Sequence, residues 1–189
     1  WYTPVTGIWQ TVWLEPVSKK HIEDVRTTPD IDQGTISFEV AAAGTTYGDV
    51  VEITILDGSK TVSTTKAAVG EPIVIAVPNA KLWSPESPFL YDTKIALLDN
   101  GKAQDEVEGY FAMRKISKKR DDKGIMRMQL NNNDYFQFGP LDQGWWPDGL
   151  YTAPTDEALK YDIVKTKEYG YNMIRKHVKV EPARWYTHC

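Results

Sequence analysis

Cysteine is almost absent from this sequence. Its 189 residues include one cysteine, Cys189, at the last position. A single thiol excludes an internal disulfide and a metal cluster built from cysteines. It does not indicate a compartment, because an exported protein without disulfides has the same composition.

Long hydrophobic runs are also missing. No apolar stretch approaches the ~20 residues that are needed to cross a bilayer. The first ten residues, WYTPVTGIWQ, lack the basic-then-apolar order of a signal peptide. We therefore expect no membrane insertion, and the first residues are typical of a segment that begins within a longer protein.

Charge of one sign is not concentrated anywhere in the chain. The formal net charge is -4, and the lysines and arginines are scattered among carboxylates. Without a basic stripe the chain cannot neutralise a phosphate backbone, so we expect no nucleic-acid partner. The sequence also predicts no cofactor and no metal site.

The residues that are present indicate a folded globular protein. Hydrophobic residues make up 41% of the chain and charged residues 25%, the usual balance for a globular fold. The length allows one complete domain and a partial second one. Seven tryptophans and ten tyrosines suit both sheet cores and the flat faces of sugars.

The first two thirds of the chain predict an all-β domain. Short β-rich runs alternate with glycine, proline, aspartate and asparagine up to about Ile116. In one run, TISFEVA, alternation places Ile36, Phe38 and Val40 on the same face. Seven such strands in roughly 100 residues predict an immunoglobulin-like β-sandwich over residues 18–118.

The segment before this sandwich has a different pattern. In GIWQTVWLEPV, large apolar residues occupy both faces of the predicted strand. Such a strand needs cover on two sides. We expect its partner sheet to lie outside residues 1–189.

The pattern changes again near residue 120. IMRMQLNNNDYFQFGP predicts a hairpin that turns at its asparagines. A helix follows, with Thr155 as N-cap and Gly170 as its stop, and then a strand in YNMIRKHV. Helix followed at once by strand is typical of a parallel βαβ unit. A TIM (β/α)8 barrel needs ~250 residues, so residues 119–189 predict only the first elements of an incomplete barrel.

Two motifs make the sequence similar to family 2 of the glycoside hydrolases, which includes β-galactosidases, β-glucuronidases and β-mannosidases. They are WSPESPFLY, within the predicted sandwich, and N-x-I-R followed by a histidine, within the predicted barrel strand. The resemblance implies three parts: residues 1–17 as the last strand of a jelly-roll sugar-binding domain, 18–118 as a sandwich that supports the barrel, and 119–189 as the start of the catalytic barrel.

The resemblance also implies the chemistry of the parent protein. Retaining glycosidases need two carboxyl groups ~5 to 5.5 Å apart. In this family the two glutamates come from barrel strands four and seven, which would follow Cys189. We therefore expect no catalytic residue in this chain and no activity from it alone, although the parent hydrolyses β-glycosides.

Five residues are candidates for sugar binding. By resemblance, Arg175 would lie near the nucleophile and His177 would contact sugar hydroxyls. The alternatives are a structural ion pair for Arg175 and a polar loop position for His177, because many family members have one more residue between the two. In the loop LDQGWWPDG, Trp145 and Trp146 beside Asp142 combine stacking and hydrogen-bonding groups. Adjacent side chains point apart, so at most one tryptophan would stack on a sugar.

Further charged residues surround these candidates. Asp148 and Glu181 are carboxylates in loops that would line an active face. Lys176, Lys179 and Arg184 could attract an acidic sugar or could be ordinary solvated charges.

The sequence is also compatible with two other roles. A sandwich can serve as a free-standing carbohydrate-binding or adhesion module, although such a module has no use for a βαβ unit. Alternatively, residues 125–128 and 173–178 could expose apolar faces that drive self-association. A carbohydrate is the expected substrate of the parent, and family resemblance favours a periplasmic or extracellular parent.

Overall fold

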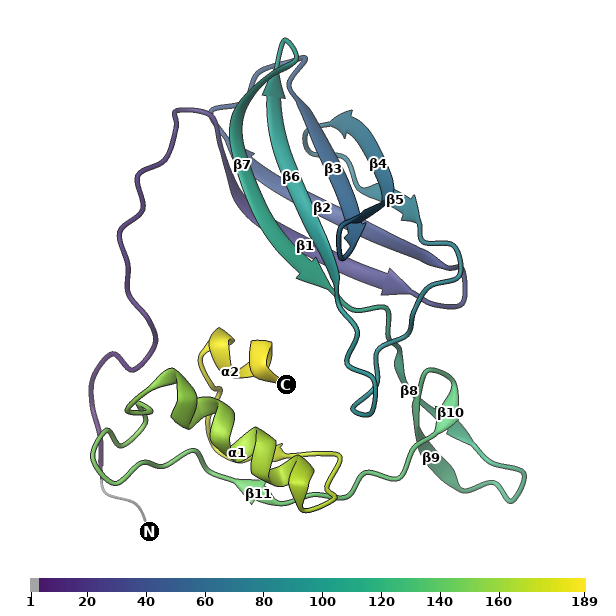
Figure 1. Ribbon diagram of the computed structural model, residues 1–189, viewed down its shortest axis with the longest axis vertical. Coiled ribbons are helices and arrows are strands. Elements are labelled where there is room, and N and C mark those ends of the chain that lie inside the picture. Colours follow the sequence, from purple (N-terminus) through teal and green to yellow (C-terminus); the bar gives the residue numbers. More distant parts are fainter. Residues whose placement is uncertain (1–3) are drawn as a thin grey trace. The chain divides into compact units, whose positions relative to one another are not determined.

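The computed structural model describes residues 4–189, which form two compact units (Figure 1). Residues 15–135 make up the first unit. The second unit combines the segment that ends at Leu14 with Phe136–Cys189.

The first unit contains a seven-stranded antiparallel β-sandwich. One sheet has three strands in the order β1-β2-β5 and the other has four in the order β4-β3-β6-β7. The two sheets face each other in Figure 1. The strands are β1 His21–Asp30, β2 Thr35–Ala43, β3 Val50–Asp57, β4 Lys60–Ala68, β5 Ile73–Ala76, β6 Tyr91–Asp99 and β7 Lys102–Phe111. The predicted immunoglobulin-like sandwich is confirmed.

The turn between β6 and β7 follows directly from its sequence. Asn100 and Gly101 both have positive φ, 48° and 78°. An Asn-Gly pair suits such a turn, and its backbone twist matches the twist of the flanking strands. The turn thus sets the pairing of Asp99 with Lys102 at the end of the hairpin.

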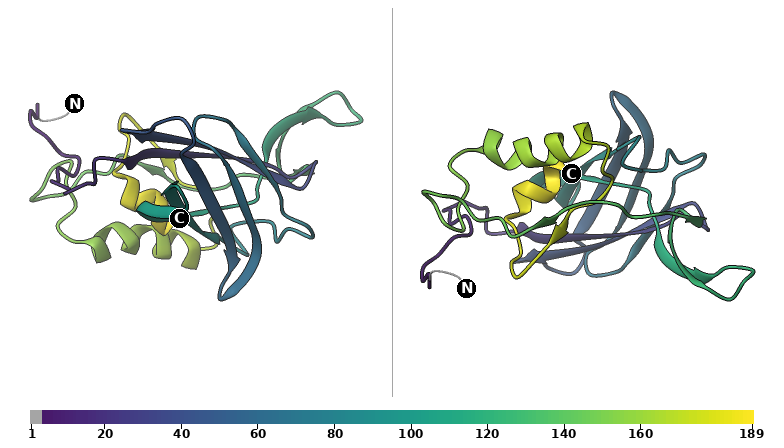
Figure 2. Two further views of the ribbon diagram at one scale, coloured as in Figure 1. Left: turned by 90° about the horizontal axis from the view of Figure 1, so that it is seen from above. Right: turned by 90° about the horizontal axis from the view of Figure 1, so that it is seen from below.

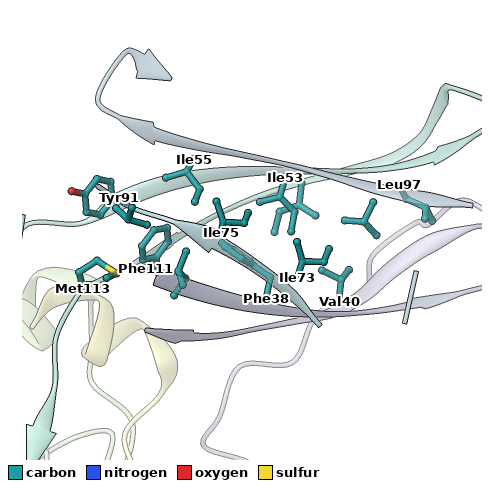
Figure 3. Close-up of a cluster of buried hydrophobic side chains, with 14 residues drawn as sticks. Phe38, Val40, Ile53, Ile55, Ile73, Ile75, Tyr91, Leu97, Phe111 and Met113 are labelled. Carbon is teal, nitrogen blue, oxygen red and sulfur yellow. The ribbon is translucent and has the colours of Figure 1, made fainter. Parts of the chain in front are cut away.

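The core lies between the two sheets and consists of alternate strand residues (Figure 3). Ile36 and Phe38 are fully buried and Val40 nearly so, as their alternation predicts. Phe111 connects the aromatic residues, because it stacks on Tyr91 with ring centroids 5.3 Å apart and meets Phe38 edge to face at 5.9 Å. This apolar contact makes the sandwich self-contained.

Truncating Phe38 should strongly destabilise the sandwich. We expect Phe38→Ala to lower the free energy of unfolding by ~3–5 kcal/mol, because it leaves a cavity at the centre of the core. Val74→Ala is the matched control, since Val74 lies on β5 with 64% of its surface exposed. Urea denaturation measures both. Equal losses for the two variants would contradict the packing described above.

A charged network closes one end of the sandwich. The Lys20 ammonium lies 2.9 Å from Asp49 and 2.8 Å from Asp99. Asp49 also accepts hydrogen bonds from the backbone and hydroxyl of Thr46. The bonds from Lys20 and Thr46 hold the pKa of Asp49 below its usual value, and the two carboxylates raise the pKa of Lys20.

This network should make stability depend on pH in acid. Because the pKa of Asp49 is lower in the folded chain than its reference value of 3.8, its contribution is present above that value and is lost as pH falls through the folded pKa. We expect Asp49→Asn to destabilise the sandwich at pH 7, with the difference from wild type shrinking below about pH 4. Denaturation curves between pH 2 and 7 test this. A difference that stays constant with pH would contradict it, and Asp122→Asn, in an exposed turn, is the control.

A small three-stranded sheet follows the sandwich within the first unit. Its strands are β8 Ile116–Arg120, β9 Met126–Leu130 and β10 Asn133–Asp134, in the order β10-β9-β8. Asn131 and Asn132 form the turn between β9 and β10 with positive φ, so the predicted asparagine hairpin is confirmed.

The motif WSPESPFLY is attached to this small sheet. The side-chain amide of Asn131 donates to the carbonyl of Trp83 at 2.9 Å, and the guanidinium of Arg114 lies over the Trp83 ring at 4.7 Å. The hydroxyl of Tyr135 donates to Glu86 at 2.8 Å. These contacts give the motif a structural role, because they fix the small sheet on the sandwich.

The second unit is a parallel βα unit. It contains β11 Leu141–Asp142, α1 Asp156–Glu168, β12 Arg175–Lys176 and α2 Ala183–His188. The two strands pair in parallel, and α1 and α2 lie side by side (Figure 2). Thr155 caps α1 by accepting a hydrogen bond from the amide of Ala158, as predicted. Gly170 follows the helix with a φ of 81°.

The segment before the sandwich forms no strand among its described residues, 4–20. In the second unit, the ring of Trp9 packs on Tyr151 with centroids 5.4 Å apart, and the side-chain amide of Gln10 donates to the carbonyl of Val180. An isolated strand has no partner for its backbone groups, so the jelly-roll strand predicted for residues 1–17 stays a prediction. So do the domain limits at residues 18, 118 and 119.

Within residues 4–189, neither helix is long and apolar enough to span a membrane.

Candidate functional site

The candidate site lies at the carboxyl ends of β11 and β12. The parallel ladder begins where the amide of Asn172 donates to the carbonyl of Phe138 and continues until the amide of His177 donates to the carbonyl of Asp142. Gly139 allows this close approach, because a Cβ there would lie 1.6 Å from the carbonyl oxygen of Met173. The ladder brings Asp142 beside Lys176.

A cluster of buried charges occupies this end of the ladder, and we call it the ion cluster: Asp142, Lys176, Lys179 and Glu181. The Lys176 ammonium lies 2.6 Å from both carboxylates. Lys179 lies 3.4 Å from Glu181, and the side chains of these two residues are only 4% and 3% exposed. Two ammoniums balance two carboxylates, which meets the requirement that buried charges be paired.

The ion cluster is hydrogen-bonded to residues 143–151, which contain Trp145 and Trp146 and which we call the tryptophan loop. Lys179 donates to the carbonyls of Gly144 at 2.7 Å and Tyr151 at 3.2 Å, and its ammonium lies 5.1 Å from the centre of the Tyr151 ring. Asp142 accepts from the amide of Gly144 at 2.6 Å. The loop between these residues therefore depends on the buried charges for its conformation.

The backbone is adapted to this cluster at two positions. Gly144 has a φ of 62°, and a Cβ there would lie 2.2 Å from Glu181 Oε1. Val178 has a φ of 61°, which is a strained conformation for a β-branched residue. Strain of this kind persists only where the surroundings enforce it, and Val178 lies between the two buried lysines.

The five sugar-binding candidates are not all free in this structure. Asp142 belongs to the ion cluster. Trp145 meets Tyr151 edge to face with centroids 5.2 Å apart. Trp146 forms a tight turn with Leu150 through two backbone hydrogen bonds. Both tryptophans are half-buried, and which of them would meet a sugar stays a prediction.

Arg175 and His177 differ in their surroundings. Arg175 is exposed. His177 is half-buried, and its Nδ1 atom is buried without a hydrogen-bond partner. Buried polar atoms usually have partners, and residues 4–189 supply none to this nitrogen. The alternation expected for the strand places Lys176 on the opposite side from these two residues, and Lys176 points into the ion cluster.

The lysines and Arg184 have internal partners. Lys176 and Lys179 are bound as described above, and Lys176 also lies over the Trp185 ring at 4.8 Å. Arg184 bonds to both oxygens of Asp156 at 2.8 and 3.1 Å, and His188 lies 2.9 Å from the same carboxylate. These bonds hold the pKa of Asp156 far below its usual range. They join α2 to the first turn of α1 and leave no cation of this set free for an acidic sugar.

The negative charges of the cluster reach α1. Partial burial, together with the nearby charges of Asp142 and Glu181, raises the pKa of Asp162, while Lys176 opposes the change. Asp162 therefore lies close enough to the ion cluster to interact with its charges.

The sandwich offers a less suitable site. A groove of about 580 Å³ lies between the β1–β2 turn and residues 76–82, and small or aliphatic side chains form most of its lining. Asp32 in its wall is bound by Lys115 and Asn132. A sugar site combines aromatic stacking with free polar groups, and this groove lacks the aromatic part.

The sequence identified Lys176, Lys179 and Glu181 but not their association. The signal is the order K-x-x-K-x-E directly after a strand end. This order alone does not predict that the three side chains meet, because their meeting depends on the positive φ of Val178.

An antiparallel β-sandwich followed by a short parallel βα unit defines a mainly β chain with a small α/β part. The model of the family "Glycosyl hydrolases family 2" matches residues 20–114. The chain belongs to this family.

The similarity to known relatives extends beyond the sandwich to nearly the whole chain. The β-galactosidase of Photobacterium profundum is 27% identical over 98% of this chain, and that of Streptococcus thermophilus is 26% identical over 97%. The chain spans about a fifth of the length of these relatives, 19% and 18%. The crystal structure of the FMN-binding β-glucuronidase from Facaelibacterium prausnitzii L2-6 matches 92% of this chain and 28% of its own, with a TM-score of 0.76 and 22% identity. Such a likeness shows a shared fold.

Gly144→Ala should destabilise the second unit by displacing Glu181. The added methyl group is disfavoured by the positive φ and would overlap the Glu181 carboxylate. Gly170→Ala is a matched control, because Gly170 also has positive φ but nothing within 4 Å of its Cβ position. We expect Gly144→Ala to cost ~1–3 kcal/mol more than the control. Hydrogen exchange of α1 and β12 amides measures the loss, and equal losses would contradict the contact with Glu181.

Proposed function

We propose that this chain is a central part of a retaining β-glycosidase. In this proposal residues 18–118 are a support domain, residues 119–189 begin a catalytic (β/α)8 barrel, and residues 1–17 end a jelly-roll domain. Membership of the family supports the class of reaction. The substrate is a β-linked oligosaccharide or polysaccharide.

The observation that favours a barrel is the parallel pairing of β11 with β12 across α1. A β-strand, a helix and a second parallel strand form the repeating unit of (β/α)8 barrels. In these barrels the active site forms at the carboxyl ends of the strands. Asp142 and Lys176 are the last residues of their strands, and Arg175 and His177 lie on either side of Lys176.

We assign sugar binding to the region that the ion cluster supports. The unpartnered Nδ1 of His177 and the exposed Arg175 are free to meet a ligand or another part of the barrel, and the 143–151 loop supplies aromatic rings. Asp142 has a different role, because its carboxylate is bound by Lys176 and by the amide of Gly144. In this proposal it orients the loop and does not contact the sugar.

We further propose that the catalytic carboxylates follow residue 189 in the parent. A retaining mechanism needs one carboxyl group as nucleophile and one as proton donor. Asp142 and Glu181 share the Lys176 ammonium, so both carboxylates are engaged in ion pairs. Asp148 is exposed and accepts from the amide of Gly149. These contacts favour structural roles for the three carboxylates.

The parent protein should hydrolyse an aryl β-glycoside with retention of configuration, whereas the 189-residue chain should not. The measurement uses a panel of aryl β-galactosides, β-glucuronides and β-mannosides, with ¹H NMR to identify the anomer that is released first. The α-galactoside is the control substrate. Turnover by the purified 189-residue chain that survives removal of contaminating hydrolases would contradict the assignment of the catalytic pair, and an inverted product would contradict the mechanism.

A further inference from the structure

Glu181 connects the two elements to which sugar binding is assigned. Its Oε1 atom meets Lys176, which lies between Arg175 and His177, and also Lys179, which binds the carbonyls of Gly144 and Tyr151. From this arrangement we propose that Glu181 is a positioning residue. It holds the tryptophan loop in a fixed position relative to the end of β12. The inference rests on the proposed function, and it concerns a residue that does not itself touch the sugar.

Charge balance makes Glu181 necessary for this arrangement. The ion cluster has two cations and two anions, and without Glu181 only Asp142 would remain to face both lysines. Breaking one member of a buried ion pair leaves an uncompensated charge, which either takes up water or moves away. Movement of Lys179 would release the carbonyls of Gly144 and Tyr151, and with them both ends of the loop that contains Trp145 and Trp146.

The backbone around Glu181 supports a positioning role. Val178, between the two lysines that pair with Glu181, has a φ of 61°, a strained conformation for a β-branched residue. At Gly144 a side chain would overlap the Glu181 carboxylate. The Tyr186 hydroxyl lies 3.3 Å from the Glu181 amide, which fixes the main chain behind the carboxylate. The space left by Gly144 and the bond to Tyr186 therefore both fit Glu181 in this position.

The test compares Glu181→Gln, the double variant Glu181→Gln/Lys179→Met and the control Glu168→Gln in the full-length parent. Glu168 pairs with Lys165 on the exposed surface of α1, so its substitution removes an ion pair of the same chemistry far from the loop. Each variant is assayed for thermal stability, kcat and KM on the best aryl β-glycoside of the panel.

We expect Glu181→Gln to lower both stability and kcat/KM, the latter roughly 10- to 100-fold and mainly through a higher KM, because misplaced binding groups weaken sugar binding. The double variant removes the surplus cation and should regain stability. It should not regain kcat/KM, because the bonds from Lys179 to the loop carbonyls are also gone. The control should match wild type.

Two results would overturn the proposal. One is recovery of kcat/KM together with stability in the double variant, which would make Glu181 a structural residue only. The other is an unchanged kcat/KM in Glu181→Gln. If the wild-type parent hydrolyses no glycoside, the proposed function fails instead. Hydrogen exchange of residues 143–151 then tests whether Glu181 positions the loop. Unchanged protection of this loop in Glu181→Gln would overturn it, and lost protection would support it.

Discussion

The second unit depends on the sharing of one ammonium, that of Lys176, between two carboxylates. Asp142 ends one strand, Lys176 ends the next, and Glu181 lies beyond a turn. Their charges are largely removed from water, so each is tolerated only while the others stay in place. The parallel ladder, the turn at Val178 and the tryptophan loop are therefore linked through these charges.

The two units are stabilised by different physics. The sandwich buries alternate aliphatic and aromatic side chains between two sheets, and its Lys20, Asp49 and Asp99 network lies near the ends of strands. The βα unit buries few apolar side chains, and α1 has no fully buried residue. Its cohesion comes from ion pairs, from the bond between Arg184 and Asp156, and from the ring contacts of Trp9 and Trp145 with Tyr151. This polar cohesion resembles that of a functional site more than that of a hydrophobic core.

The sequence predicted those features that depend on local pattern. Alternation identified Ile36, Phe38 and Val40, and capping chemistry located α1 between Thr155 and Gly170. The ion cluster could not be predicted in the same way, because it depends on the positive φ of Val178, which the residue type disfavours. Its lysines therefore resembled ordinary surface charges, and the family resemblance pointed to Arg175 and His177 instead.

The parallel ladder has edges that further strands could pair with. Two paired strands leave their outer backbone groups without strand partners, and a two-stranded sheet is marginally stable in water. Here α1, α2 and the ion cluster compensate only in part, since the apolar side chains of Leu141 and Val178 are about half exposed or more. Parallel sheets are normally covered on both faces. Further strands beside β11 and β12, as in a closed barrel, would supply partners for the free edges. The carboxyl end of the ladder, at Lys176, would then border the site of such a barrel.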